Sequence, residues 1–385
     1  MHGVVVRDGH TELVDDLQVR RPEAGEVTVR VLASGLCRSD LLPIDEPSGA
    51  PMVLGHEAAG VIEAVGSAVD GLEIGQMVAV TCPVPCNNCD ACSRGLYTAC
   101  ASSFGFGEAP FSRDGLPILA LARVSSLAEF ITVDQFQVHP VASLSAPAAA
   151  LVGCAVSTGY GMTRNVVELK TGETIMVFGV GGIGINSIQT ARLIGARRII
   201  AVDINEEKEA VARKFGADEF IAIKPGMASE SIVAEVRHVA PEQVDAVVDC
   251  TGQASVLEAA QLLLKAGGRL GLVGIPHAGG TMKLDINNAM YRHITVRGAL
   301  NGACNPFTDV PDIVQLAEQG RLDLESQVSH VFPLSEYQEA VDALRQGRVL
   351  RAVIEMPSGT KYKKINRDTP ENADQYHGSE NPFRN

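Results

Sequence analysis

The chain has 385 residues, of which 46% are hydrophobic, so it is long enough for two domains with sizeable cores. Its formal charge of −14 at pH 7 argues against nucleic acid or an anionic membrane as a partner, because both would repel it. Aromatic residues make up only 4% and glycines number 38, a composition that suits an α/β protein with many tight turns.

The amino-terminal segment already carries Arg7 and Asp8, so no secretory leader is expected. No segment approaches the roughly 18 apolar residues in a row that a spanning helix needs. The nine cysteines are an odd number in a chain too long to need disulfides, which favours reduced thiols available as metal ligands. These features predict a cytoplasmic protein.

Residues 1–155 are predicted to be rich in short strands. The segments 26–37, 58–66 and 76–84 carry β-branched runs bounded by glycine, proline or aspartate. From about residue 156 to 298, strands and helices alternate, which predicts βαβ units and a buried parallel sheet. The expected strands lie in 174–184, 198–205, 219–223, 245–252 and 269–275, and the expected helices in 186–196, 206–217, 231–240 and 255–265.

Residues 299–355 return to a mixed pattern, with amphipathic helical segments at 310–320 and 335–347. They are expected to rejoin the first domain. Residues 356–385 form a polar extension with few aliphatic side chains, read as a disordered or surface-lying tail, with a role in subunit contacts as the alternative.

A glycine-rich turn predicts a dinucleotide site. Gly179, Gly181 and Gly184 form a G-x-G-x-x-G pattern after a predicted strand and at the start of a predicted helix. Asp203 follows about 20 residues later, where its carboxylate would bind the ribose hydroxyls and repel a 2′-phosphate. The pattern therefore favours NAD over NADP, although Asp203 could instead cap a loop in solvent.

Four cysteines lie within the stretch 86–100, spaced Cys-x2-Cys-x2-Cys-x7-Cys. Cys86, Cys89, Cys92 and Cys100 suffice for a closed tetrahedral zinc shell, which has no position for substrate and is therefore structural. A redox Cys-x-x-Cys motif fits poorly, because three overlapping pairs lie outside the βαβ region.

A second candidate set is dispersed along the chain. Cys37, His56 and Cys154 would supply two thiolates and an imidazole with a fourth position open, as in a catalytic zinc site. Spacing alone does not single them out, since buried cysteines and histidines are usually core residues.

The motifs "CRSD", "GHEAAGVIEAVG", "LVGCAVSTGYG", "VFGVGGIG" and "VDINEEK", together with the four-cysteine stretch, resemble those of zinc-dependent medium-chain alcohol dehydrogenases in order and spacing. The resemblance covers residues 3 to 355 and is nearest to the two-zinc branch, which includes glutathione-dependent formaldehyde dehydrogenases. It implies an α/β fold with a GroES-like β-rich catalytic domain and a doubly wound Rossmann domain.

The resemblance also implies roles for individual residues. Cys37, His56 and Cys154 match the catalytic zinc ligands, and Cys86, Cys89, Cys92 and Cys100 match the structural ones. Glu57 matches an alternate ligand, Asp40 the carboxylate that orients the histidine, and Ser39 the first proton acceptor. Cofactor contacts are implied for Arg38, Arg351, Thr158, Gly182, Ile183, Lys208, Val273 and Ile275, in addition to the three fingerprint glycines and Asp203.

Two positions depart from the best-known members of the family. Leu42 replaces a histidine that often ends the proton relay, so the relay is expected to end differently. Cys82 replaces a bulky aromatic side chain beside the zinc, which predicts more room for bulky primary or secondary alcohols.

The leading prediction is therefore an NAD-dependent zinc alcohol dehydrogenase that acts on a small-molecule alcohol or aldehyde substrate and forms a homodimer or homotetramer. The alternatives are a dehydrogenase of glutathione or other thiol adducts and, from another class, a non-catalytic nucleotide-binding scaffold.

Overall fold

The computed structural model describes residues 1–47, 49–103, 109–276 and 280–358. The chain divides into two compact units, a first unit of Met1–Cys154 with the segment from Leu324 onward, and a second unit of Ala155–Asp323. The predicted start of the nucleotide-binding domain at residue 156 lies one residue from this division. Most of the predicted tail, from residue 359 onward, lies outside the described residues.

The second unit ends later than the predicted boundary at residue 298, so residues 299–323 belong to it rather than to the first unit. The reason lies in contacts that are distant in sequence. The Cys304 thiol donates to the Ser157 carbonyl at 3.0 Å, and the Asn165 side chain donates to Asp309 at 2.8 Å. These bonds tie the segment to the start of the unit.

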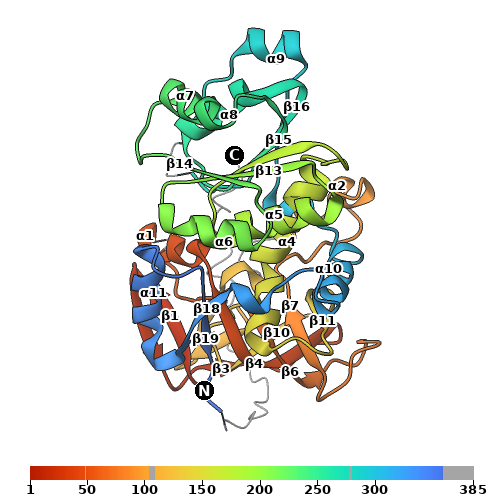
Figure 1. The fold of residues 1–385 in the computed structure, drawn as a ribbon. Helices are drawn as coiled ribbons and strands as arrows, with labels where there is room; N and C mark the ends of the chain where they lie inside the picture. Colours follow the sequence, from red (N-terminus) through yellow and green to blue (C-terminus); the bar gives the residue numbers. More distant parts are fainter. Residues whose placement is uncertain (48, 104–108, 277–279, 359–385) are drawn as a thin grey trace. The chain divides into compact units, whose positions relative to one another are not determined.

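The second unit is built on a six-stranded sheet in the order β14-β13-β12-β15-β16-β17. Figure 1 labels β13, β14, β15 and β16 of this sheet. The strands are β12 (Thr174–Phe178), β13 (Arg198–Asp203), β14 (Glu219–Ala222), β15 (Val244–Asp249), β16 (Leu264–Leu272) and β17 (Thr295–Gly298). All neighbours pair in parallel. Numbered within this unit the order is 3-2-1-4-5-6, the doubly wound arrangement, in which ligands bind where the order reverses, between β12 and β15.

Both faces of this sheet are buried. Met176 and Phe178 of β12 belong to the apolar cluster formed with α7 and α8. Ile175 and Val177, which alternate with them along the strand, are fully buried as well. Alternate residues of a strand point to opposite faces, so helices must cover both sides. The helices of this unit are α4 (Ala155–Gly161), α5 (Gly182–Ile194), α6 (Glu209–Lys214), α7 (Ser229–Val239), α8 (Ala254–Leu263), α9 (Ile286–Arg292) and α10 (Asp309–Glu318).

The first unit contains two mainly antiparallel sheets. One has the order β2-β1-β5-β9-β8-β3, formed by His10–Val14, Gly3–Arg7, Met52–Val53, Leu116–Ala120, Phe111–Arg113 and Gln18–Val19. The other has the order β11-β7-β6-β4-β19-β18, formed by Val138–Pro140, Met77–Val80, Glu57–Val65, Glu26–Leu36, Arg351–Glu355 and Val328–Pro333, with β10 (Phe130–Asp134) also pairing with β4. One shared apolar core includes residues of both sheets.

The long strand β4 positions the functional residues of the first unit. β6 pairs along most of its length, while β10 and β19 pair with its two halves on the other side. The register places Gly35 opposite Glu57. The short helices α1 (Leu42–Asp45), α2 (Asp90–Ser93) and α3 (Ala146–Ala150) and the amphipathic α11 (Tyr337–Arg345) complete the unit. Among the described residues, no helix has the length and apolar character needed to cross a membrane.

Candidate active site and metal centres

Four side chains from distant parts of the chain converge in the first unit. Cys37 directly follows β4, His56 and Glu57 lie at the start of β6, and Cys154 precedes α4. One candidate ligand atom from each lies within 4.8 Å of all the others. Gly153 permits this approach, because a side chain there would lie 2.5 Å from the Val80 carbonyl oxygen.

Asp40 fixes two of these residues at once. One carboxylate oxygen accepts a hydrogen bond from the Cys37 backbone N–H at 2.9 Å, and the other lies 2.7 Å from Nδ1 of His56. Asp40 is almost fully buried, so water does not weaken these bonds. With Nδ1 engaged, Nε2 is the nitrogen available to a metal, the arrangement typical of a metal-binding histidine.

Glu57 is fully buried and forms an ion pair with Arg351, the first residue of β19. The second carboxylate oxygen of Glu57, Oε1, is buried without a hydrogen-bond partner among the described residues. Gly35 makes room for the carboxylate, since a Cβ there would lie 2.0 Å from Glu57 Oε2. An orphaned carboxylate oxygen beside two thiols and an imidazole is what a cation-binding site would contain.

Burial and close contacts perturb the pKa values in this site. The neighbouring Cys154 thiol, with help from His56, holds the pKa of Cys37 well below its usual value. Burial alone would lower the pKa of His56, but the Asp40 carboxylate and Cys154 raise it well above its usual value. Burial raises the pKa of Glu57 to about 7 against the opposing charge of Arg351. The site contains four groups that can be negatively charged, Cys37, Cys154, Glu57 and Asp40, but only two that can be positively charged among the residues described, His56 and Arg351.

The donor set fits zinc. Two thiolates and one imidazole, with the fourth coordination position open, are a typical catalytic zinc arrangement. Glu57 adds a carboxylate oxygen within 4.8 Å of the other three ligand atoms. A zinc ion held there would act as a Lewis acid on an alcohol or carbonyl oxygen.

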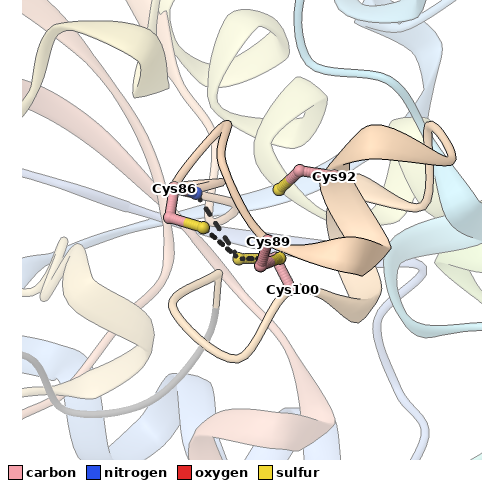
Figure 2. Close-up of side chains that lie close together, drawn as sticks. All are labelled: Cys86, Cys89, Cys92 and Cys100. Carbon is pink, nitrogen blue, oxygen red and sulfur yellow. Dashed lines mark hydrogen bonds between the residues drawn. The ribbon is translucent and has the colours of Figure 1, made fainter.

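The predicted structural cluster also forms (Figure 2). Cys86, Cys89, Cys92 and Cys100 offer sulfur atoms that all lie within 4.8 Å of one another, and Cys92 is carried by the helical turn α2. The sulfur of Cys100 lies 3.5 Å from that of Cys86 and 3.7 Å from that of Cys89. Four sulfurs placed 2.3 Å from a tetrahedral zinc would be about 3.8 Å apart, so this spacing fits the ion.

Local hydrogen bonds favour the thiolate form of Cys100. The backbone N–H groups of Cys86 and Ser102 each donate to the Cys100 sulfur at 3.4 Å. Although burial opposes it, these bonds lower the pKa of Cys100 to about 6. All nine cysteines lie among the described residues, and none of them forms a disulfide.

The predicted dinucleotide site lies at the carboxyl end of β12. Gly179 has a φ of +90°, which favours glycine, and a Cβ at Gly184 would lie 1.9 Å from the Gly179 carbonyl oxygen. A Cβ at Gly181 would meet nothing within 4 Å, so the start of α5 stays open to a phosphate. These features fit a dinucleotide.

Asp203, which is predicted to bind the ribose, and Lys208, which is predicted to contact the cofactor, lie together. The Lys208 ammonium is 3.0 Å from Asp203 Oδ2, which also accepts the Val180 N–H at 2.6 Å. The carboxylate is therefore joined to the glycine-rich turn itself.

The other predicted residues are distributed over both units. In the second unit, α4 carries Thr158 and passes close to Ile183, since a Cβ at Gly159 would lie 2.4 Å from the Ile183 carbonyl oxygen. Val273 and Ile275 follow β16, and Ile275 is half exposed.

Of the residues predicted in the first unit, Ser39 Oγ lies 3.7 Å from Cys37 Sγ, and Arg38 is exposed. Arg351 is buried against Glu57, and Cys82 is buried with its thiol donating to the His56 carbonyl at 3.4 Å.

Ser126 is a supporting residue that sequence reasoning did not identify. Its hydroxyl accepts the Glu57 backbone N–H at 3.1 Å and lies 2.6 Å from the Ser34 hydroxyl. The neighbouring Ser125 has a φ of +60°, an uncommon conformation for a serine. No motif in the sequence marks this contact, because its partners lie 69 and 92 positions away.

Comparisons with known proteins agree with both units. A family model described as the alcohol dehydrogenase GroES-like domain matches residues 23–143, and one described as zinc-binding dehydrogenase matches residues 182–319. Among curated relatives, alcohol dehydrogenase 1 of Oryza sativa subsp. indica is 30% identical over 361 residues, covering 89% of this chain and 94% of the relative. An alcohol dehydrogenase of Malus domestica is 31% identical and covers 90% of this chain and 94% of its own length.

Solved structures show the same relationship. An alcohol dehydrogenase zinc-binding domain protein from Burkholderia ambifaria superposes with a TM-score of 0.85 at 30% identity, covering 92% of this chain and 98% of its own. Benzyl alcohol dehydrogenase from Acinetobacter calcoaceticus also gives a TM-score of 0.85, at 27% identity, covering 92% of this chain and 99% of its own.

Proposed function

Because this chain belongs to the zinc-dependent medium-chain alcohol dehydrogenase family and is an oxidoreductase, we propose that it exchanges hydride between a bulky alcohol and NAD. We further propose one catalytic and one structural zinc ion per chain. The observation that carries the proposal is the convergence of Cys37, His56, Glu57 and Cys154 within 4.8 Å. Binding of a nucleotide alone would not need this set.

In the proposed reaction the chain's own residues bind, orient and move a proton. Cys37, His56 and Cys154 would hold the zinc, and Asp40 keeps the imidazole in the orientation that presents Nε2. Ser39, whose hydroxyl lies 3.7 Å from Cys37 Sγ, would take the alcohol proton. Leu42 has no titratable group, so the proton would have to reach solvent without help from this position.

The proposed preference for NAD rests on Asp203. Its carboxylate is held by Val180 and Lys208 next to the glycine-rich turn, where it would accept hydrogen bonds from the ribose hydroxyls. A 2′-phosphate at the same place would meet this negative charge. The proposed pyrophosphate contacts of Arg38 and Arg351 and the nicotinamide contacts of Thr158 and Ile183 rest on the family resemblance. So do the cofactor contacts proposed for Val273 and Ile275.

The proposed preference for bulky alcohols rests on Cys82. Burial raises the pKa of its thiol to about 12, so it is a small neutral side chain that donates to the His56 carbonyl. A cysteine occupies much less volume than an aromatic residue, which would leave space beside the metal. The structural similarity to a benzyl alcohol dehydrogenase supports the same substrate class.

An alcohol and aldehyde panel with NAD and NADP, with and without glutathione, tests this proposal. We expect a higher kcat/KM for benzyl alcohol than for ethanol, with NAD preferred. Cys82→Phe should lower the ratio of these two values by roughly tenfold or more, whereas Cys82→Ala, which keeps the space, should not.

A wild-type preference for ethanol would refute the assignment of bulky substrates. Formaldehyde oxidation that requires glutathione would favour the thiol-adduct reaction, and a chain holding one zinc ion and lacking activity would favour a scaffold.

We also propose a cytoplasmic homo-oligomer that assembles through the second unit. Strand β17 lies at the edge of its sheet, and large apolar side chains are exposed around it and on α9. These side chains are Leu284, Ile286, Met290, Tyr291, Val296 and Leu300. A second copy of the chain would cover them and pair with the strand edge. Light scattering of the wild type and of Met290→Lys/Tyr291→Lys tests this, and a monomeric wild type would refute it.

A further inference from the structure

Asp249 is a buried acidic residue at the point where the order of the parallel strands reverses. It is the last residue of β15 and pairs in register with Phe178, the last residue of β12. Only 1% of its surface is exposed. In doubly wound sheets the ligand crevice opens at this point, outside the carboxyl ends of the strands.

The Asp249 carboxylate organises the loop that follows β15. Oδ1 accepts the Thr251 hydroxyl at 2.6 Å and the Thr251 backbone N–H at 3.1 Å, while Oδ2 accepts the Gly252 N–H at 2.9 Å. The Thr251 hydroxyl in turn accepts the Gln253 N–H at 3.2 Å. These bonds hold the loop from its first turn to the start of α8.

The backbone carbonyl of Asp249 holds a second loop, the one after β16. It accepts the N–H groups of Val273 and Gly274, each at 3.1 Å. The two loops then pack backbone against backbone. A Cβ at Gly274 would lie 2.0 Å from the Gly252 nitrogen, and one at Gly252, whose φ is +68°, would lie 2.7 Å from the Ile275 carbonyl.

A third loop reaches the same junction. The position of a Cβ on Gly179, the first glycine of the fingerprint, is 3.1 Å from the Thr251 side chain and 3.4 Å from Cys250. The Thr251 side chain, which Asp249 orients, thus lies against the glycine-rich turn. Asp249 therefore controls, directly or through Thr251, the loops after β12, β15 and β16.

A buried carboxylate is costly unless it is well satisfied. Burial raises the pKa of Asp249, although the hydrogen bonds from Thr251 and Gly252 oppose this change. Within the described part of the chain, no cationic side chain forms an ion pair with it. A leucine would leave the backbone N–H groups of Thr251 and Gly252 and the Thr251 hydroxyl without this acceptor, and an asparagine would set an amide donor against them, so a carboxylate is the group that suits this junction.

We propose that Asp249 is a positioning residue for the cofactor, which fixes the three loops at the strand reversal in the shape that NAD requires. The inference rests on the proposed NAD site and goes beyond it, because Asp249 itself need not touch the dinucleotide. It acts through Thr251, Gly252 and the segment 273–275.

The test replaces Asp249 with asparagine and compares the variant with a matched control on the same strand. Asp249→Asn preserves size but places an amide donor against N–H or O–H donors. Asp245, at the amino end of β15, is also buried, pairs with Lys265 and accepts the Thr174 N–H at 2.8 Å, so Asp245→Asn disturbs the same strand at its opposite end. NADH binding is measured by the fluorescence of bound NADH, at a temperature where circular dichroism shows each variant folded.

We expect Asp249→Asn to raise the Kd for NADH and the KM for NAD about tenfold, with the KM for alcohol changed less than about twofold. Asp245→Asn should lower the Tm but leave the Kd for NADH unchanged. If Asp249→Asn does not fold, Thr251→Val, which keeps the shape and removes the hydroxyl, should raise the Kd about threefold.

Unchanged NADH binding in a folded Asp249→Asn protein, or equal losses of NADH binding in the two aspartate variants, would overturn the positioning role. A wild-type protein that does not bind NADH would instead refute the proposed NAD site on which the role depends.

Discussion

The two groups of candidate metal ligands in the first unit are built in different ways. Cys86, Cys89, Cys92 and Cys100 come from a single stretch of fifteen residues, and the Cys100 thiol accepts the backbone N–H groups of Cys86 and Ser102, within and next to that stretch. Cys37, His56, Glu57 and Cys154 are spread over more than a hundred residues and are oriented by Asp40 and Arg351, which come from other elements.

This difference shows which group can carry chemistry. Four thiolates complete a tetrahedral shell, so the local cluster can hold a loop but cannot bind substrate. The dispersed set has three side chains of the types that bind zinc, a carboxylate with one oxygen unpartnered among the described residues, and a buried network around them. A zinc ion with an open coordination position would depend on residues outside its ligand set to orient the ligands, and Asp40 and Arg351 are placed to do this.

The largest expected effect is a loss of alcohol oxidation when a residue of the dispersed set, but not of the four-cysteine cluster, is replaced. Cys154→Ala should remove one zinc ion per chain and lower kcat/KM for alcohol oxidation roughly 1,000-fold or more, equivalent to at least about 4 kcal/mol, because the Lewis acid is lost. Metal analysis and steady-state kinetics measure both quantities. The control Cys304→Ala removes a buried thiol outside both groups and should keep both zinc ions. Full activity of Cys154→Ala would show that the dispersed set is not the catalytic centre.

The second effect should appear in stability rather than chemistry. Cys89→Ser should release the other zinc ion and lower the free energy of unfolding by about 3–4 kcal/mol, because metal binding contributes directly to folding. Chemical denaturation with and without added zinc measures the loss. Activity per folded molecule should change much less than in Cys154→Ala. A Cys89→Ser protein as stable as the wild type would contradict the structural role of the cluster.

A third test concerns His139, which is buried like His56 but, among the described residues, has the Thr81 hydroxyl at 3.2 Å in place of a carboxylate partner. Burial lowers the pKa of His139 from 6.5 to about 4, so the unfolded chain binds a proton between these pH values and the folded chain does not. The free energy of unfolding should therefore fall by about 3 kcal/mol as the pH drops through this window. His139→Gln should flatten this part of the pH profile, and an identical profile in the variant would contradict the assignment.

The smallest expected effect concerns Asp40, which orients Cys37 and His56 of the dispersed set. Asp40→Asn keeps the hydrogen bond to the Cys37 N–H possible but removes the negative charge next to His56, and should weaken binding of the catalytic zinc roughly 10–100-fold. Competition with a chelator measures this affinity, and the structural zinc in the same sample is the internal control. Equal weakening of both zinc ions would indicate a general loss of folding instead.

Much of the second unit could be predicted from the sequence. Most of the predicted strands and helices between 174 and 265 match β13 to β15 and α5 to α8 within four residues, because continuous apolar runs and 3.6-residue periodicity are local properties. The segment 174–184 contains β12 in its first five residues but continues into α5. The boundary at 298 was wrong, because residues 299–323 join this unit through contacts such as Cys304 to Ser157 that leave no local pattern.

The sequence by itself therefore determined the four-cysteine cluster and the glycine-rich turn, since a short stretch of chain fixes the mutual positions of its own residues. Only the tertiary structure decided how the dispersed set is supported. The pairing of Glu57 with Arg351 and the bond from Ser126 to the Glu57 backbone depend on which strands lie next to β6. The junction formed by Asp249 likewise depends on β12 and β15 being neighbours in the sheet. Such contacts join residues that are far apart in the chain, and strand order and register, rather than spacing along the sequence, bring them within bonding distance.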